Sequence, residues 1–170
     1  METLLYKFDM ALVVLYFCVF VLYFRAFFSN HRPIGRVFLI ALPVVLVLHL
    51  VKLMLQGKCQ GHCPIVGLGE TFSFTALALG IIYFVLERRQ KYYATGVIFI
   101  GIVLLFQSVT IYSTSNETIL AENLRNIPFA FHGPLALIGI SAFGASALYG
   151  VLYLILFRLL KTKQLILTII

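Results

Sequence analysis

The chain has 170 residues, of which 62% are hydrophobic and 11% are charged, and its mean hydropathy is +1.04. Soluble domains are usually about 45–50% apolar and about 25% charged, so a water-soluble enzyme and a disordered chain are both excluded. The formal net charge is +7. Nucleic-acid binding would need basic residues clustered on one folded face, and the sequence has no such cluster, so we expect no nucleic-acid partner.

The apolar residues occur in long runs, which predicts membrane-spanning helices of roughly 20 residues each. The runs do not alternate apolar and polar residues, as the strands of a membrane β-barrel would. We therefore predict an all-α integral membrane protein, a single domain (1–170) built as a bundle of five transmembrane helices. The spans are expected at about Met10–Phe28, Val37–Leu55, Leu68–Leu86, Tyr92–Tyr112 and Phe131–Leu160.

The basic residues predict the orientation, because the cytoplasmic loops of membrane proteins are enriched in lysine and arginine. With the N-terminus outside and the C-terminus in the cytoplasm, nine basic residues and one acid, Glu87, lie inside. Four basic and five acidic residues, including Lys52 and Asp9, then lie outside or in the outer half of a span. The inner basic residues are Arg25, Arg32, Arg36, Arg88, Arg89, Lys91, Arg158, Lys161 and Lys163.

Two segments lie outside the predicted spans. Residues 114–128 are expected to form an outer amphipathic segment, with Leu120, Leu124 and Ile127 on its apolar face. The seven residues after Lys163 are too few to cross a bilayer. They either lie at the membrane interface, or the chain is the front part of a longer protein.

Three of the four histidines fall on the expected outer side of the membrane. His49 lies about two thirds of the way along the second span, His62 precedes the third span, and His132 opens the fifth. Imidazoles on separate helices at similar depth are what a bis-histidine b-type haem requires. The alternative is that His49 hydrogen-bonds a neighbouring helix while His62 and His132 lie at the lipid headgroups. His31 is expected to be solvated in a cytoplasmic loop.

Glu70 is the acidic residue closest to these histidines. It lies near the start of the third span, where a carboxylate suits the positive end of the helix dipole. The same carboxylate could pair with Lys58 or Arg125, or accept a hydrogen bond from a ligand histidine. All three roles stay open at the level of sequence.

The cysteines predict no metal site. Cys59 and Cys63 flank His62 in an order that differs from the motif for covalent haem attachment. A disulfide between them is possible if the loop faces an oxidising compartment. Zinc would need further ligands that the neighbouring sequence does not offer, and Cys18 reads as a small apolar residue of the first span.

Small residues recur at helical spacing in two of the predicted spans. In the third span they are Gly69, Ser73, Ala76 and Gly80. In the fifth span they continue the face that begins with His132, and they are Ala136, Gly139, Ala142, Ser146 and Gly150. Such faces let membrane helices approach closely, or they leave room for a flat ligand.

Three stretches resemble the CcsA/ResC-type proteins of system II cytochrome c biogenesis and their HemX-like haem-handling relatives. The stretch 61–71 is similar to the Gly-His-x-Pro segment that leads into a Glu-Ser pair, here Glu70-Thr71. The stretch 124–132 resembles the amphipathic outer segment that carries a histidine before the next span. The stretch 135–154 resembles the small-residue pattern of that span. The resemblance covers about residues 48–161.

This resemblance implies a haem-binding subunit that holds or relays haem at the outer side of the membrane for cytochrome c maturation. His62 and His132 match haem-ligand positions, His49 is a third candidate, and Glu70 matches the acidic residue near the haem. The implied partners are a c-type cytochrome and other membrane subunits, in a bacterial inner membrane rather than a thylakoid. The chain contains no tryptophan, so the family's Trp-rich haem-binding loop is missing, and a partner is expected to supply it.

Two other interpretations remain. In the first, the b-type haem passes electrons from a quinol to an attached partner in a respiratory complex. In the second, the chain is a structural anchor with no cofactor, in which the histidines only pack. No nucleophile with a base, carboxylate pair or phosphate loop is evident. Catalysis would therefore belong to a cytochrome c synthase or oxidoreductase complex as a whole.

Overall fold

The computed structural model describes residues 2–28, 35–60, 65, 67–90, 94–112 and 127–169. These residues form five α-helices and contain no strand, which confirms the predicted all-α membrane fold class. The helices are α1 (Glu2–Phe28), α2 (Gly35–Gln60), α3 (Leu68–Gln90), α4 (Gly96–Tyr112) and α5 (Ile127–Ile169). By length and composition, α1, α2, α3 and α5 each contain a segment that can cross a membrane. The 17 residues of α4 lie at the lower limit for a span.

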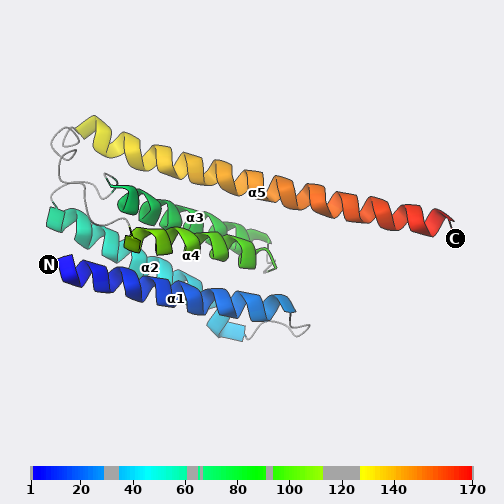
Figure 1. The fold of residues 1–170 in the computed structure, drawn as a ribbon, viewed down its shortest axis with the longest axis horizontal. Coiled ribbons are helices and arrows are strands. Elements are labelled where there is room, and N and C mark those ends of the chain that lie inside the picture. The colour runs from blue at the N-terminus through cyan, green and yellow to red at the C-terminus, as the bar shows by residue number, and fades with distance from the viewer. Residues whose placement is uncertain are drawn as a thin grey trace.

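The helices α1, α3 and α5 run in one direction, and α2 and α4 run in the opposite direction (Figure 1). We call the end of the bundle at which α2 ends and α3 begins the α2/α3 end. The last turns of α1 and α3 lie at the other end, and they carry Arg25, Arg88 and Arg89. The positive-inside rule therefore predicts that the α2/α3 end faces outward.

The packing is built around α3, which contacts α2, α4 and α5, while α1 closes the group by contacting α2 and α4. The four small residues of α3 noted above are all buried. A Cβ atom added at Gly80 would lie 2.7 Å from Leu46 Cδ2 of α2. Small side chains therefore let α3 approach its neighbours closely, as helices in lipid require.

The apolar core contains residues of α1, α2, α3 and α4 together with Ala145 of α5, and its aromatic part lies away from the α2/α3 end. Tyr83 of α3 stacks on Phe99 of α4, with 5.0 Å between the ring centroids. Tyr23 of α1 meets Tyr83 edge to face at 5.9 Å, and Tyr149 of α5 contacts Phe99 at 5.2 Å. Gly96 lies against Tyr23 and Tyr83, so this aromatic cluster, which joins four helices, includes a close contact with one small residue.

Most of the long helix α5 is exposed, and it packs chiefly on α3. Among residues 131–162, for which burial is described, Ser141 and Ala145 are buried. The small residues of the predicted stripe in α5, Gly139 and Gly150 among them, are exposed, and a Cβ on either glycine would meet no atom within 4 Å. Within the described part of the chain, the stripe in α5 therefore does not mediate helix packing, unlike the one in α3.

We expect Gly96→Ala to destabilise the protein by about 1–3 kcal/mol, the usual cost of overpacking a core. The new methyl group would overlap the Tyr23 ring and lie 2.6 Å from Tyr83 Oη. The matched control is Gly150→Ala, which has open space and should be neutral or up to about 1 kcal/mol more stable. Unfolding free energies measured in lipid–detergent mixtures check this, and equal effects of the two changes would contradict the packing described.

Candidate functional site

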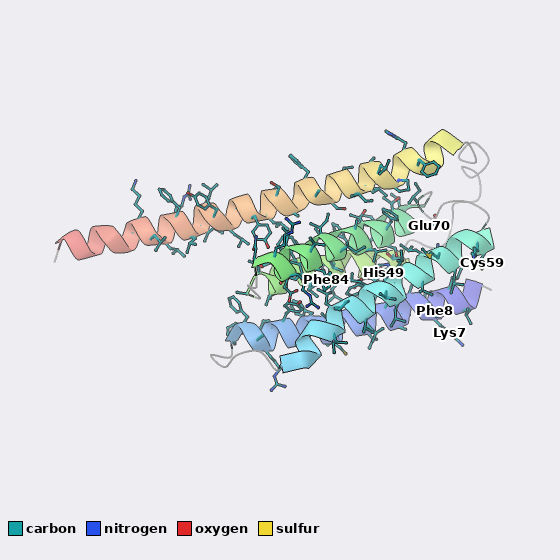
Figure 2. All side chains as sticks on the ribbon, turned by 180° about the vertical axis from the view of Figure 1, so that it is seen from behind. Lys7, Phe8, His49, Cys59, Glu70 and Phe84 are labelled. Atoms are coloured by element: carbon teal, nitrogen blue, oxygen red, sulfur yellow. The ribbon has the colours of Figure 1, made fainter. Side chains whose placement is uncertain are left out.

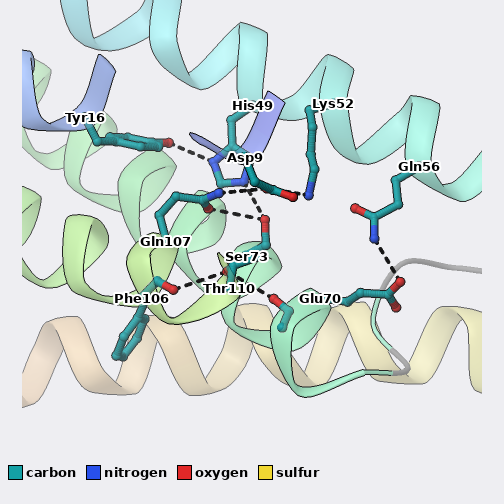
Figure 3. Close-up of polar contacts among 11 residues, drawn as sticks. Asp9, Tyr16, His49, Lys52, Gln56, Glu70, Ser73, Phe106, Gln107 and Thr110 are labelled. Carbon is teal, nitrogen blue, oxygen red and sulfur yellow. Dashed lines mark hydrogen bonds and ion pairs between the residues drawn. The ribbon is translucent and has the colours of Figure 1, made fainter. Parts of the chain in front are cut away.

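A chain of buried polar side chains crosses the bundle toward its α2/α3 end and joins four helices (Figure 3). Each of its six members is at most 3% exposed. They are Asp9 and Tyr16 of α1, His49 and Lys52 of α2, Ser73 of α3 and Gln107 of α4. The pairs on α1 and α2 are spaced by seven and three residues, so each pair lies on one face of its helix. These six residues make up most of the buried polar side chains near this end of the described interior.

The hydrogen bonds of this polar network all run in one direction, from donor to acceptor. Gln107 Nε2 donates to Asp9 Oδ1 at 3.0 Å, so Gln107 Oε1 is the acceptor for the Ser73 hydroxyl at 3.3 Å. Because the Ser73 proton is used there, Ser73 Oγ must accept from His49 Nε2–H at 2.9 Å. His49 Nδ1 then accepts from the Tyr16 hydroxyl, also at 2.9 Å. The network thus assigns the Nε2–H tautomer to His49, and every donor points toward Asp9.

The polar network ends in an ion pair, in which Lys52 Nζ lies 2.7 Å from Asp9 Oδ1. The side chains of both residues are almost fully buried. Charged groups within membrane spans are costly unless they are paired. The pairing leaves the network without net charge, and it ties α1 to α2.

His49 is fully buried within this network, in the interior of the bundle (Figure 2). Both of its ring nitrogens are hydrogen-bonded, to Tyr16 and to Ser73. Ligation of a metal through Nδ1 would require Tyr16 to withdraw its hydroxyl. The arrangement agrees with the alternative stated above, in which His49 hydrogen-bonds neighbouring helices.

The other predicted site residues are not brought together in the described structure. His132 is exposed on α5, and His62 lies outside the described residues. Glu70 lies in the first turn of α3, where Oε1 accepts from Gln56 Nε2 at 2.9 Å and Oε2 accepts from the Gly67 amide at 3.4 Å. Glu70 therefore links the end of α2 to the start of α3.

The cysteines add no metal centre to the described part of the chain. Cys18 and Cys59 are exposed free thiols, and Cys63, the other cysteine of the possible disulfide, lies outside the described residues. Among the residues that the structure describes, no group of three histidine, cysteine or acidic side chains is arranged to hold a metal ion. The predicted outer segment, 114–128, is described only from Ile127 onward.

Two polar features are not predicted by the sequence reasoning. Gln107 carries an amide in the middle of an apolar run, and it joins α4 to the ion pair. At the opposite end of the bundle, the Tyr23 hydroxyl donates to the buried Glu87 at 2.5 Å. Asp9 and Lys52 have opposite charges within apolar runs, and that pattern is the signal that could have predicted their pairing.

Comparison with known proteins identifies two similar bacterial proteins, both named Protein HemX. The protein of Brevibacillus brevis is 26% identical over 157 residues, which are 89% of this chain and 56% of the relative. The protein of Bacillus subtilis (strain 168) is 23% identical over 167 residues, which are 96% of this chain and 60% of the relative. The chain thus spans little more than half the length of these relatives. No family model and no solved structure matches it.

We expect Lys52→Met alone to cost about 3–5 kcal/mol of stability, because it leaves the Asp9 carboxylate buried without its partner. The double variant Lys52→Met with Asp9→Asn removes both charges and should recover most of that loss. Lys58→Met is the matched control, because Lys58 is exposed on the same helix. This change should alter the free energy of unfolding by no more than about 0.5 kcal/mol in either direction. Unfolding free energies test this, and additive effects of the two changes would contradict a buried pair.

We also expect nitrogen NMR of the histidine-labelled protein in bilayers to show His49 as a neutral imidazole protonated at Nε2. The reason is that Ser73 must accept from Nε2 and Tyr16 must donate to Nδ1. The His49 signal is identified by its loss in His49→Gln. A signal from the opposite tautomer would contradict the direction of the hydrogen-bond chain.

Proposed function

We propose that this protein is a haem-binding membrane subunit that holds or relays haem at the outer side of the membrane for cytochrome c maturation. The similarity to two proteins named HemX, over most of the chain, supports a haem-related role. Both relatives are bacterial, which supports a bacterial cytoplasmic membrane as the location. The CcsA/ResC part of the resemblance rests on the sequence motifs alone.

The observation that carries the proposal is the position of His132 on α5. Its imidazole is exposed, and the residues one and two turns further along the same face, Ala136 and Gly139, are exposed and small. A Cβ on Gly139 would have no atom within 4 Å, so this face can accept a flat group against the helix. The described residues therefore fit a haem held by His132.

In this proposal His132 and His62 are the two axial ligands of the haem iron. His62 comes from the segment before α3, and Glu70 at the start of α3 would orient a ligand histidine or position that segment. His49 is the third candidate, but its bonds to Tyr16 and Ser73 favour a role in holding the helices. The bound haem would supply a redox-active iron. The partner proteins would use that iron or receive the haem itself.

The proposal includes protein partners as well as lipid. A c-type cytochrome would receive the haem, and another membrane subunit would supply the Trp-rich element that this chain lacks. The span of only 56–60% of the relatives' length agrees with a functional unit that is larger than these five helices.

We expect the protein purified from haem-replete cells to show the Soret absorption band of a b-type haem. His132→Ala and His62→Ala should each lose most of the bound haem, because each removes one proposed iron ligand. His31→Ala is the matched control and should keep the wild-type ratio of haem to protein.

A colourless wild-type protein would contradict the proposal. Rapid reduction of the bound haem by added quinol would instead favour electron transfer from quinol over haem relay. Loss of haem in His31→Ala as well would show that the effect of the other two changes is not ligand-specific.

A further inference from the structure

Two buried polar groups on α2 point toward each other without sharing a hydrogen bond. They are the ammonium of Lys52, a residue that is 1% exposed, and the side-chain carbonyl oxygen of Gln56, a residue that is 6% exposed. Among the residues that the structure describes, Gln56 Oε1 has no hydrogen-bond partner. An ammonium has three N–H donors, and among the described residues the partner shown for Lys52 is Asp9.

The orientation of the Gln56 amide follows from its other bond. Gln56 Nε2 donates to Glu70 Oε1 at 2.9 Å, and a flipped amide would place two acceptor oxygens against each other. The carbonyl oxygen is therefore on the side of Lys52, as Figure 3 shows. An acceptor without a donor and a cation with spare donors thus lie on the same face of α2.

Lys52 and Gln56 are neighbours along one face of α2. Residues four apart on a helix have Cβ atoms about 5–6 Å from each other. A bridging molecule must accept from the ammonium and donate to the carbonyl. A cation would be repelled by Lys52, and a simple anion such as chloride has no proton to donate to Oε1. Because both side chains are almost fully buried, a small molecule that both accepts and donates a hydrogen bond is required, and water meets these conditions.

We infer that a bound water molecule bridges Lys52 Nζ and Gln56 Oε1 and connects the Asp9–Lys52 ion pair to the α2/α3 end of the bundle. The half-buried Glu70, which is bonded to Gln56, marks the side from which the water enters. The polar chain then extends from Glu70 to Tyr16 deep in the bundle. The ion pair is thereby hydrated from the α2/α3 end of the bundle.

The test is water-edited solid-state NMR of lysine-labelled full-length protein in lipid bilayers. The Lys52 ammonium signal is identified by its loss in the double variant Lys52→Met with Asp9→Asn, which keeps the interior free of an unpaired charge. We expect rapid magnetisation transfer from water to Lys52 in the wild type. The transfer should be lost in Gln56→Met, while the Lys52 signal itself remains.

Gln90→Met is the matched control, because Gln90 carries the same amide on the exposed last turn of α3. It should leave the water transfer to Lys52 unchanged. Absence of transfer in the wild type would show a dry ion pair and overturn the inference. Undiminished transfer in Gln56→Met would show that the Gln56 carbonyl does not hold the water, and would overturn it as well.

Discussion

The ion pair between Asp9 and Lys52 is the constraint on which the rest of this bundle depends. Apolar helices in lipid gain little from burying one more apolar face, so their relative register must come from packing and polar contacts. The buried carboxylate and ammonium do not allow α1 to slide along α2, because each group would then lose its partner. The pair therefore fixes α1 against α2, and Gln107, bonded to the same carboxylate oxygen, brings α4 into that register.

The helix α3 joins this arrangement through small residues. Ser73 is short enough to let α2 and α4 approach on both sides, and its hydroxyl bridges His49 and Gln107. One turn earlier, the Gly69 carbonyl accepts a hydrogen bond from Thr110 of α4 at 3.2 Å. Close approach and polar contact thus occur at the same positions, which explains why a stripe of small residues on α3 also contains a hydroxyl.

The fold class and the helices could be predicted from the sequence because long apolar runs leave few alternatives in a membrane. The site could be predicted only in part. His49 stands out in an apolar run, but only the fold shows that Tyr16 and Ser73 occupy its two nitrogens. Such partners come from positions 24 and 33 residues away, and helix periodicity contains no information about which helices meet.

The length of α5 has a consequence for its placement in a bilayer. A helix of 43 residues is about 65 Å long, whereas the hydrocarbon layer is about 30 Å thick. Even at a tilt of about 40°, near the upper end of the usual range, roughly 26 residues would cross that layer. Hydrophobic mismatch of this size cannot be absorbed by tilt. Several turns of α5 must therefore extend into the headgroups and the aqueous phase, and Arg158 and Lys161 are suited to the level at which the helix leaves the lipid.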